Sequence, residues 1–289
     1  MILPDFILPS RINQQWEYSG IDSPEKCLDK LHFARYPHKI TYNYNSRGFR
    51  DQEWPSDHEL QQAIWCIGDS FTVGVGNLLE HTWPYLLEQR TGQSTINVSM
   101  DGASNNWIAR HAVDVLTVVN PDIIVIHWSY LHRREGLTHI NIDAKNSFLN
   151  YYKNIKDPLW PEITNIKNFS SLPMYIQNEI LKRHDNQSWR EQLNDEELKL
   201  WHIRSEIHED ISNTLECIDL VDCHRRNNCI IHSFIPEFII EGQSDFYQQL
   251  KTDNTVIQEL RRLDLARDSH HYDINTSENF VQQIMQVLN

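Results

Sequence analysis

The sequence predicts an α/β fold in which helices cover both faces of a central parallel sheet. From residue 63 onward, short apolar runs of strand length alternate with stretches of helical periodicity. The clearest run, "DIIVIHWS", is short, continuous and rich in β-branched residues, as buried parallel strands are. Strands and helices in this order imply right-handed crossovers, which make the strands parallel.

Four strands and three helices are expected in this region. The strands are 63–67, 94–100, 122–129 and 227–235, and the helices are 82–92, 106–120 and 277–288. Gly92 and Pro121 are expected to end the first two helices, and Ser277 to cap the start of the last one.

The rest of the chain divides into an arm and an insertion. Residues 1–60 are rich in polar and aromatic residues with Pro and Gly, and we expect an N-terminal arm that packs on a domain formed by 61–289. A turn is expected at 45–51. The segment 136–226 is long and polar and has a helix-like pattern, so we expect a helical insertion there that acts as a lid or cap.

Composition and charge argue against several classes of partner. The formal charge is −14, from 26 basic and 40 acidic residues, which disfavours binding to nucleic acid or to anionic lipid. No apolar run approaches the ~20 residues that span a bilayer. The first residues lack a basic segment and are interrupted by Pro4 and Asp5, so no signal peptide is expected. We therefore expect a cytoplasmic protein, or a phage-encoded protein associated with the virion.

The chain has 15 His residues, enough to raise the question of a metal site. The stretch "HIRSEIHED" places Glu206 four residues after His202, but neither H-E-x-x-H nor a calcium-binding loop occurs. A solvated charged helix face is the better interpretation of this stretch. We expect no metal and no cofactor.

The loop after the first predicted strand holds a serine at a strand-to-helix turn. It reads "GDSFTVGVG", with Ser70 at the turn. A phosphate-binding loop would need a lysine and a dinucleotide loop a third glycine, and neither is in place. Ser70 therefore fits a nucleophile, and the alternative is a helix N-cap without chemistry.

The loop before the last helix holds an acid and a histidine three residues apart. Asp268 and His271 in "LARDSHHYD" allow a carboxylate to accept a hydrogen bond from an imidazole, which leaves the other ring nitrogen to act as a base. Their position matters more than their spacing, because this loop and the Ser70 loop reach the same sheet edge. His270 is expected to point away, and Asp264 and Asp273 are less favoured partners for the histidine.

Three motifs in this order resemble the SGNH/GDSL hydrolase superfamily. They are "GDSFT" after the first strand, the glycine-bearing "SMDGASN" after the second, and the C-terminal D-x-x-H. The stretch "NSRGFRD" also resembles the arm that precedes the GDS block in many of these proteins. The resemblance covers 63–135 and 227–289, and it implies a flavodoxin-like three-layer sandwich. No motif covers the helical middle of the chain.

The resemblance implies a catalytic triad and an oxyanion hole. Ser70 would be the nucleophile, His271 the general base and then acid, and Asp268 the group that orients His271. The oxyanion hole would use the backbone N–H groups of Ser70 and Gly102.

One departure from the family concerns the third oxyanion donor. The family usually has G-x-N-D after the third strand, and this chain reads "HWSYLHRRE" there, without an Asn. Ser129 is nearest to that position, and Asn105 or Asn106 from the preceding loop are alternatives. Losing one oxyanion donor typically costs about 10²–10³ in rate.

Several polar or aromatic residues at the same edge are candidates for binding substrate. They are Asp69, Asn105, Trp128, Arg133 and Arg134. The arginines fit either a polar or anionic part of a substrate or a surface ion pair. Trp128 could present a flat face to a sugar ring, and it fits the core equally well.

The expected function is ester hydrolysis that removes a short acyl group, with O-acetyl groups on carbohydrate as candidate substrates. The expected partner is therefore a small-molecule or glycan ester. One alternative is a non-catalytic glycan-binding or phage structural protein on the same scaffold. Another is an O-acyltransferase that uses the same residues.

Overall fold

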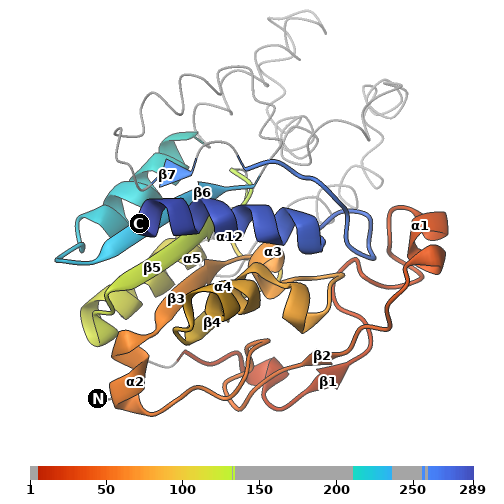
Figure 1. The fold of residues 1–289 in the computed structure, drawn as a ribbon, viewed down its shortest axis with the longest axis horizontal. Coiled ribbons are helices and arrows are strands. Elements are labelled where there is room, and N and C mark those ends of the chain that lie inside the picture. The colour runs from red at the N-terminus through yellow and green to blue at the C-terminus, as the bar shows by residue number, and fades with distance from the viewer. Residues whose placement is uncertain (1–5, 132, 134–210, 236–255, 258–259) are drawn as a thin grey trace, which may run out of the picture.

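A computed structural model of the chain shows how these motifs come together (Figure 1). The structure describes residues 6–131, 133, 211–235, 256–257 and 260–289. Most of the insertion expected at 136–226 therefore lies outside the described residues. Its last part, 211–222, is helical.

A five-stranded parallel sheet forms the centre of the domain, in the order β4-β3-β5-β6-β7. The strands are β3 (Ile64–Gly68), β4 (Thr95–Ser99), β5 (Ile123–Trp128), β6 (Cys229–Phe234) and β7 (Val256–Ile257). Counted along the chain, this is the order 2-1-3-4-5 of flavodoxin-like folds. The first four strands confirm the predicted runs. The sequence does not predict β7, because two residues are too few to show a pattern.

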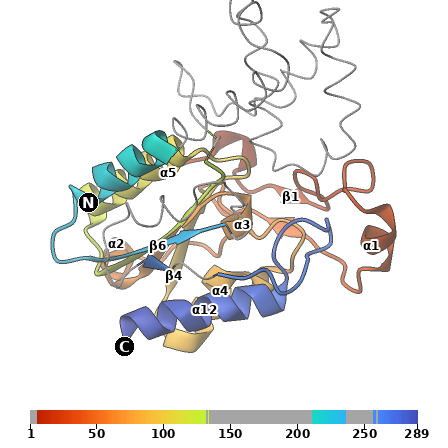
Figure 2. The ribbon, with the colours of Figure 1, turned by 90° about the horizontal axis from the view of Figure 1, so that it is seen from above.

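Helices cover both faces of the sheet and complete the predicted three layers (Figure 2). The helices α4 (Trp83–Thr91) and α12 (Ile274–Leu288) lie on one face, and α5 (Asn105–Asp114) lies with the helix at 211–222 on the other. Gly92 ends α4 at φ 68°, as predicted. The predicted second helix is α5 continued by a π-helical turn, Val115–Val119.

The last helix begins three residues earlier than predicted, and Ser277 is not its cap. Asp273 caps α12 and accepts a hydrogen bond from the Ile274 N–H. The carboxylate of Asp264 accepts from the next two N–H groups of the helix, those of Asn275 and Thr276. Carboxylates suit this place because the first N–H groups of a helix lack partners within it and carry partial positive charge.

The register of the sheet aligns the carboxyl ends of three neighbouring strands, β4, β3 and β5. Gly68 of β3 pairs with Ser99 of β4 on one side and with His127 of β5 on the other. All five residues of β3 are buried, so this strand lies at the middle of the core. The loops that follow these three strands consequently leave the sheet at the same edge.

The N-terminal arm contains two short strands and two short helices. They are β1 (Gln15–Trp16), α1 (Lys30–Arg35), β2 (Tyr42–Asn43) and α2 (Asp57–Gln62), with β1 and β2 antiparallel. Phe6, Phe49 and Leu60 of the arm are buried in the same hydrophobic cluster as the sheet. The turn expected at 45–51 is present, with the Asn45 side chain accepting hydrogen bonds from the N–H groups of residues 47 and 49.

Arg50 ties this turn to the loop that follows Ser70. Its side chain is fully buried and donates to the carbonyls of Val73, Gly74 and Asn77 at 3.2, 2.5 and 2.7 Å. The guanidinium also lies 4.3 Å from the centre of the Tyr42 ring. A buried cation with several carbonyl partners is costly to remove, because the carbonyls then lose their donors.

We predict that Arg50→Met destabilises the protein through these orphaned carbonyls. The free energy of unfolding should fall by about 3 kcal/mol, measured by urea denaturation at neutral pH. Arg47→Met is the matched control, because the Arg47 guanidinium lies over the Trp54 ring at 5.0 Å, its hydrogen bonds among the described residues are made by its backbone, and its loss should cost under about 1 kcal/mol. Equal losses in the two variants would contradict the role assigned to Arg50.

Candidate active site

Ser70 begins α3 (Ser70–Val73), a single helical turn that directly follows β3. The side chain of Asp69 accepts a hydrogen bond from the Phe71 N–H and caps the turn. The turn is so tight that a Cβ on Gly68 would lie 2.1 Å from Thr72 Oγ1. Glycine is therefore required before the Asp-Ser pair, and the pair is held at the carboxyl end of the strand.

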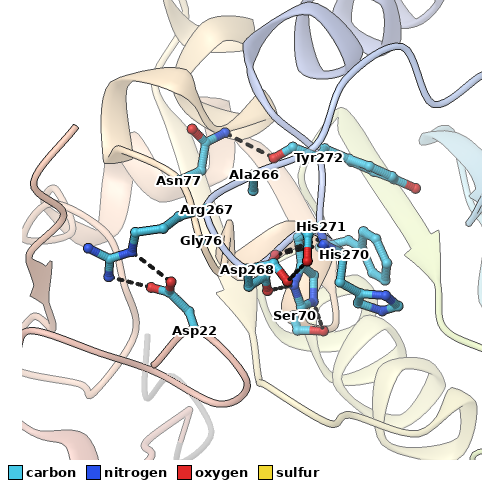
Figure 3. A network of polar contacts seen from close by, with 12 residues as sticks. Asp22, Ser70, Gly76, Asn77, Ala266, Arg267, Asp268, His270, His271 and Tyr272 are labelled. Carbon is cyan, nitrogen blue, oxygen red and sulfur yellow. Dashed lines mark hydrogen bonds and ion pairs between the residues drawn. The ribbon is translucent and has the colours of Figure 1, made fainter. Parts of the chain in front are cut away.

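The structure brings Ser70, His271 and Asp268 into one chain of hydrogen bonds (Figure 3). His271 Nε2 lies 2.7 Å from Ser70 Oγ, and His271 Nδ1 lies 2.5 Å from Asp268 Oδ2. The other oxygen of Asp268 accepts from the N–H groups of His270 and His271, at 3.0 Å each. Residues 201 positions apart in sequence thus meet at the sheet edge.

The charge of Asp268 determines which ring nitrogen of His271 carries a proton. Burial raises the pKa of this carboxyl, but the facing His271 and the hydrogen bonds it donates lower it more, to about 2. Asp268 is therefore ionised and can only accept. His271 Nδ1 must then be the donor to Asp268, which leaves Nε2 to accept the Ser70 proton.

Gly102 lies in the loop after β4 and has the left-handed conformation that favours glycine, with φ 78°. The space around the position of its missing Cβ is open to 4 Å. In α3 the first N–H with a hydrogen-bond partner is that of Phe71, and no partner for the Ser70 N–H occurs among the described residues. Among the described residues, neither the Ser70 N–H nor the Gly102 N–H has a hydrogen-bond partner.

The hydroxyl of Ser129 is used inside the protein, which does not support its expected role as third oxyanion donor. It donates to Asp69 Oδ2 at 2.6 Å, and Arg133 Nη1 lies 2.8 Å from the same carboxylate oxygen. Arg133 Nη1 is also 3.1 Å from Ser129 Oγ. Burial raises the pKa of the Asp69 carboxyl and Arg133 opposes this, so both donors serve to stabilise a fully buried acid.

The two asparagines expected as substitutes also have internal partners. Asn105 Oδ1 accepts from the Ser129 N–H at 2.8 Å, and its amide donates to Thr214 Oγ1 at 3.0 Å. Asn106 donates to Asn213 Oδ1 at 3.2 Å. Asn105 thus joins the loop after β5 to the helix at 211–222 and is fully buried, and Asn106 contacts the same helix.

Of the two roles that the sequence left open for Trp128, the structure places it in the core, where no face is exposed to a sugar. The side chain is fully buried, its Nε1 donates to His232 Nδ1 at 3.1 Å, and the two rings are parallel. Trp128 is the last residue of β5, and the pleat directs it into the protein. Arg133 keeps 16 % of its side chain exposed beside Asp69, and Arg134 lies outside the described residues.

His270 does not point away from the site, contrary to expectation. Its Nε2 lies 3.0 Å from the hydroxyl of Tyr130, and its ring packs against Phe71 and perpendicular to the His271 ring. Burial raises the pKa of Tyr130 to about 12, so this hydroxyl is protonated, and the tautomer of His270 decides which of the two groups is the donor. Sequence reasoning missed Tyr130 and Phe71, whose only signal was their position directly after Ser129 and Ser70.

In the described part of the chain, no group of three or more His, Cys, Asp or Glu side chains is arranged to hold a metal ion. No helix among these residues is both long and apolar enough to cross a bilayer. The stretch around His202 and Glu206 lies outside the described residues.

No protein-family model and no curated protein matches the chain. Among solved structures it is similar to one described as a lipolytic protein of the G-D-S-L family from Desulfitobacterium hafniense DCB-2, at 14 % identity and a TM-score of 0.33, over 78 % of this chain and 99 % of that one. It is also similar to a carbohydrate esterase family 2 enzyme from Corynascus thermopiles (Myceliophthora fergusii), at 11 % identity and a TM-score of 0.40, over 79 % and 67 %. A third is the esterase EstA from Pseudoalteromonas sp., at 14 % identity and a TM-score of 0.35, over 78 % and 96 %.

Likenesses this distant carry no information on activity, and the assignment of fold rests on the molecule itself. The strand order is 2-1-3-4-5, the GDS turn follows the first strand of the sheet, and the D-x-x-H loop precedes the last helix. The chain therefore has a flavodoxin-like three-layer α/β fold, with the GDS turn and the D-x-x-H loop at the same edge of its sheet.

Proposed function

We propose that the chain is a serine hydrolase of the SGNH/GDSL type that cleaves an ester and releases a short acyl group. The observation that carries this proposal is the hydrogen-bonded series Ser70 Oγ, His271 and Asp268, with His271 Nε2 at 2.7 Å from the serine. A serine is a weak nucleophile by itself, and an adjacent base oriented by a third group activates it.

The proposed reaction proceeds through an acyl-enzyme. Ser70 Oγ attacks the ester carbonyl while His271 Nε2 takes its proton, and the charge of Asp268 stabilises the imidazolium that forms. The tetrahedral intermediate collapses as His271 returns the proton to the leaving alcohol. Water then attacks the acyl-enzyme with His271 again as base, which releases the carboxylic acid and restores Ser70.

The oxyanion of each tetrahedral intermediate would be bound by the backbone N–H groups of Ser70 and Gly102. Donors fixed in place before the reaction stabilise the developing charge without reorganisation. The side chains of Ser129 and Asn105 are not part of this proposal, because each already has a buried partner. Among the described residues, these two backbone N–H groups would then be the groups that stabilise the oxyanion.

The surroundings of Ser70 support a small acyl group and a polar alcohol. The ring of Phe71 lies 4.5 Å from the His271 ring, and Tyr130 and His270 pack against Phe71, so aromatic side chains fill one side of the site. We propose that the exposed part of the Arg133 guanidinium binds a polar portion of the substrate. Acetylated carbohydrates are the first substrates to test.

We predict that Ser70→Ala abolishes ester hydrolysis. The rate with p-nitrophenyl acetate should fall by about 10⁴-fold or more, since the nucleophile is lost. Ser277→Ala is the control, because Ser277 is equally buried but lies in α12. A fluorophosphonate should label Ser70 in the unaltered protein, mapped by mass spectrometry. Unchanged hydrolysis in Ser70→Ala would refute the proposal.

The same reagents separate the alternatives. An intact, folded protein that neither hydrolyses acetyl esters nor reacts with the fluorophosphonate at Ser70 would favour the non-catalytic binding or structural role. Labelling at Ser70 with acyl groups recovered on an added sugar acceptor, rather than in water, would favour acyl transfer.

Asp268→Asn should reduce kcat by about 10⁴-fold while the fold is retained, because the amide no longer holds His271 in the reactive tautomer. Since the pKa of Asp268 is about 2, its titration should not limit activity above about pH 4. A pH–rate profile of the unaltered protein that falls with the titration of Asp268 would contradict this assignment.

The same carboxylate should make stability depend on pH in acid. Its folded pKa of about 2 lies below the ordinary value of about 3.9, so its contribution is fully present above about pH 4 and is lost as pH falls toward 2. Urea denaturation between these values should therefore show a steeper decline for the unaltered protein than for Asp268→Asn.

A change at Arg133 should affect substrates according to their polarity. Arg133→Met should raise KM for an acetylated sugar by about tenfold, and leave KM for p-nitrophenyl acetate nearly unchanged, because a charged hydrogen bond is worth about 1.5 kcal/mol. Arg133→Lys keeps a charge beside Asp69 and controls for loss of that ion pair. Equal effects on the two substrates would show that Arg133 does not bind the alcohol part.

A further inference from the structure

The N-terminal arm contacts the loop that carries Asp268 at two points, one before and one after that residue. This segment, 265–273, is here called the Asp268 loop. On one side His32 Nε2 lies 2.8 Å from the carbonyl oxygen of Ala266. On the other side the N–H of Asp29 donates to Ser269 Oγ at 3.1 Å.

Between these two contacts, a buried ion pair joins the arm to the residue next to Asp268. Arg267 Nε and Nη2 donate to the two carboxylate oxygens of Asp22 at 2.7 and 2.6 Å. The Asp22 side chain is fully buried, and that of Arg267 is 7 % exposed. Two parallel hydrogen bonds from a planar guanidinium fix both distance and orientation.

The ion pair, which Figure 3 shows, belongs to a closed ring of contacts that reaches the back of Asp268. The hydroxyl of Tyr42 donates to Asp22 and accepts from the N–H of Gly76 at 2.7 Å. The carbonyl of Gly76 accepts from the N–H of Arg267 at 2.8 Å.

Gly76 fixes how closely this ring approaches the carboxylate. A Cβ at Gly76 would lie 3.0 Å from Asp268 Cγ, so its backbone packs directly against that carboxylate. The ring therefore defines the surface on which Asp268 rests, and the arm supplies two of its members, Asp22 and Tyr42.

We infer that Asp22 and Arg267 are positioning residues, and that the arm thereby sets the orientation of Asp268 toward His271. The inference rests on the proposed function, since it concerns the same site. A buried ion pair adds little net stability, because desolvation offsets the attraction between the charges. Its direct effect here is geometric: it immobilises the residue before Asp268, while Asp29 and His32 hold the flanking positions.

The first test measures catalysis in variants of the pair. Asp22→Asn and Arg267→Met should lower kcat by about 10- to 100-fold with KM nearly unchanged, because a misplacement of about 1 Å costs this much in rate. Arg267→Lys keeps the charge but not the fork, so its kcat should lie between those of Arg267→Met and the unaltered protein.

The matched control is Asp51→Asn. Asp51 is also a carboxylate of the arm, and it accepts hydrogen bonds from the Asn97 N–H and from Trp54 Nε1 rather than from the Asp268 loop. Urea denaturation and circular dichroism measure the loss of stability in each variant. Comparison at conditions where every variant is folded removes the effect of stability on rate.

The second test does not depend on activity. In ¹H NMR the His271 Nδ1 proton, shared with Asp268, should give a low-field resonance in the unaltered protein. We expect this resonance to move or broaden in Asp22→Asn and Arg267→Met and to remain in Asp51→Asn. It should also be lost in Asp268→Asn, which assigns it.

The outcomes are distinguishable. A resonance and a kcat that change no more in Asp22→Asn than in Asp51→Asn would overturn the positioning role. An unaltered protein that lacks esterase activity and labelling at Ser70 would instead overturn the proposed function, and the resonance would still report whether Asp22 orients Asp268. If Asp22→Asn fails to fold, Arg267→Lys provides both readouts.

Discussion

The buried carboxylate of Asp268 is the group on which the arrangement of the site depends. An ionised acid removed from water must be surrounded by donors, and this one has His271 on one oxygen and two backbone N–H groups on the other. Those contacts orient the imidazole toward Ser70 and keep the pKa of the carboxyl near 2. They also require a close-packed surface behind the acid, which the backbone of Gly76 provides. The hydrogen bonds of the Asp268 carboxylate therefore both order the Asp268 loop and orient His271.

A second buried acid, Asp69, determines how the side chains next to Ser70 are arranged. It lies between β3 and α3 and takes hydrogen bonds from the Phe71 N–H, the Ser129 hydroxyl and Arg133. The Ser129 hydroxyl and Arg133 come from the loop after β5, so this loop stabilises the acid next to Ser70. The Ser129 hydroxyl is therefore engaged inside the protein, while His271 still approaches Ser70.

The N-terminal arm is part of the same unit, although it precedes the first strand of the main sheet. Its aromatic residues enter the main core, and its charged residues contact the loops that flank the site. Arg50 binds the carbonyls that follow Ser70, and Asp22 binds the residue that precedes Asp268. The two sides of the site, which are far apart in sequence, are thereby connected through one segment. This connection makes the geometry of the site sensitive to residues that never touch the reacting atoms.

The sequence alone determined the layered fold, four of the strands, and the approach of Ser70 to Asp268 and His271, because periodicity and chain order fix which loops share a sheet edge. Only the tertiary structure decided the partners of side chains: Trp128 in the core, Ser129 and Asn105 engaged internally, His270 turned toward Tyr130, and Asp22 paired with Arg267. Such pairings depend on distances between segments up to 245 residues apart. Local sequence patterns do not predict these pairings, because a buried polar group forms its hydrogen bond with whichever partner the packing brings near.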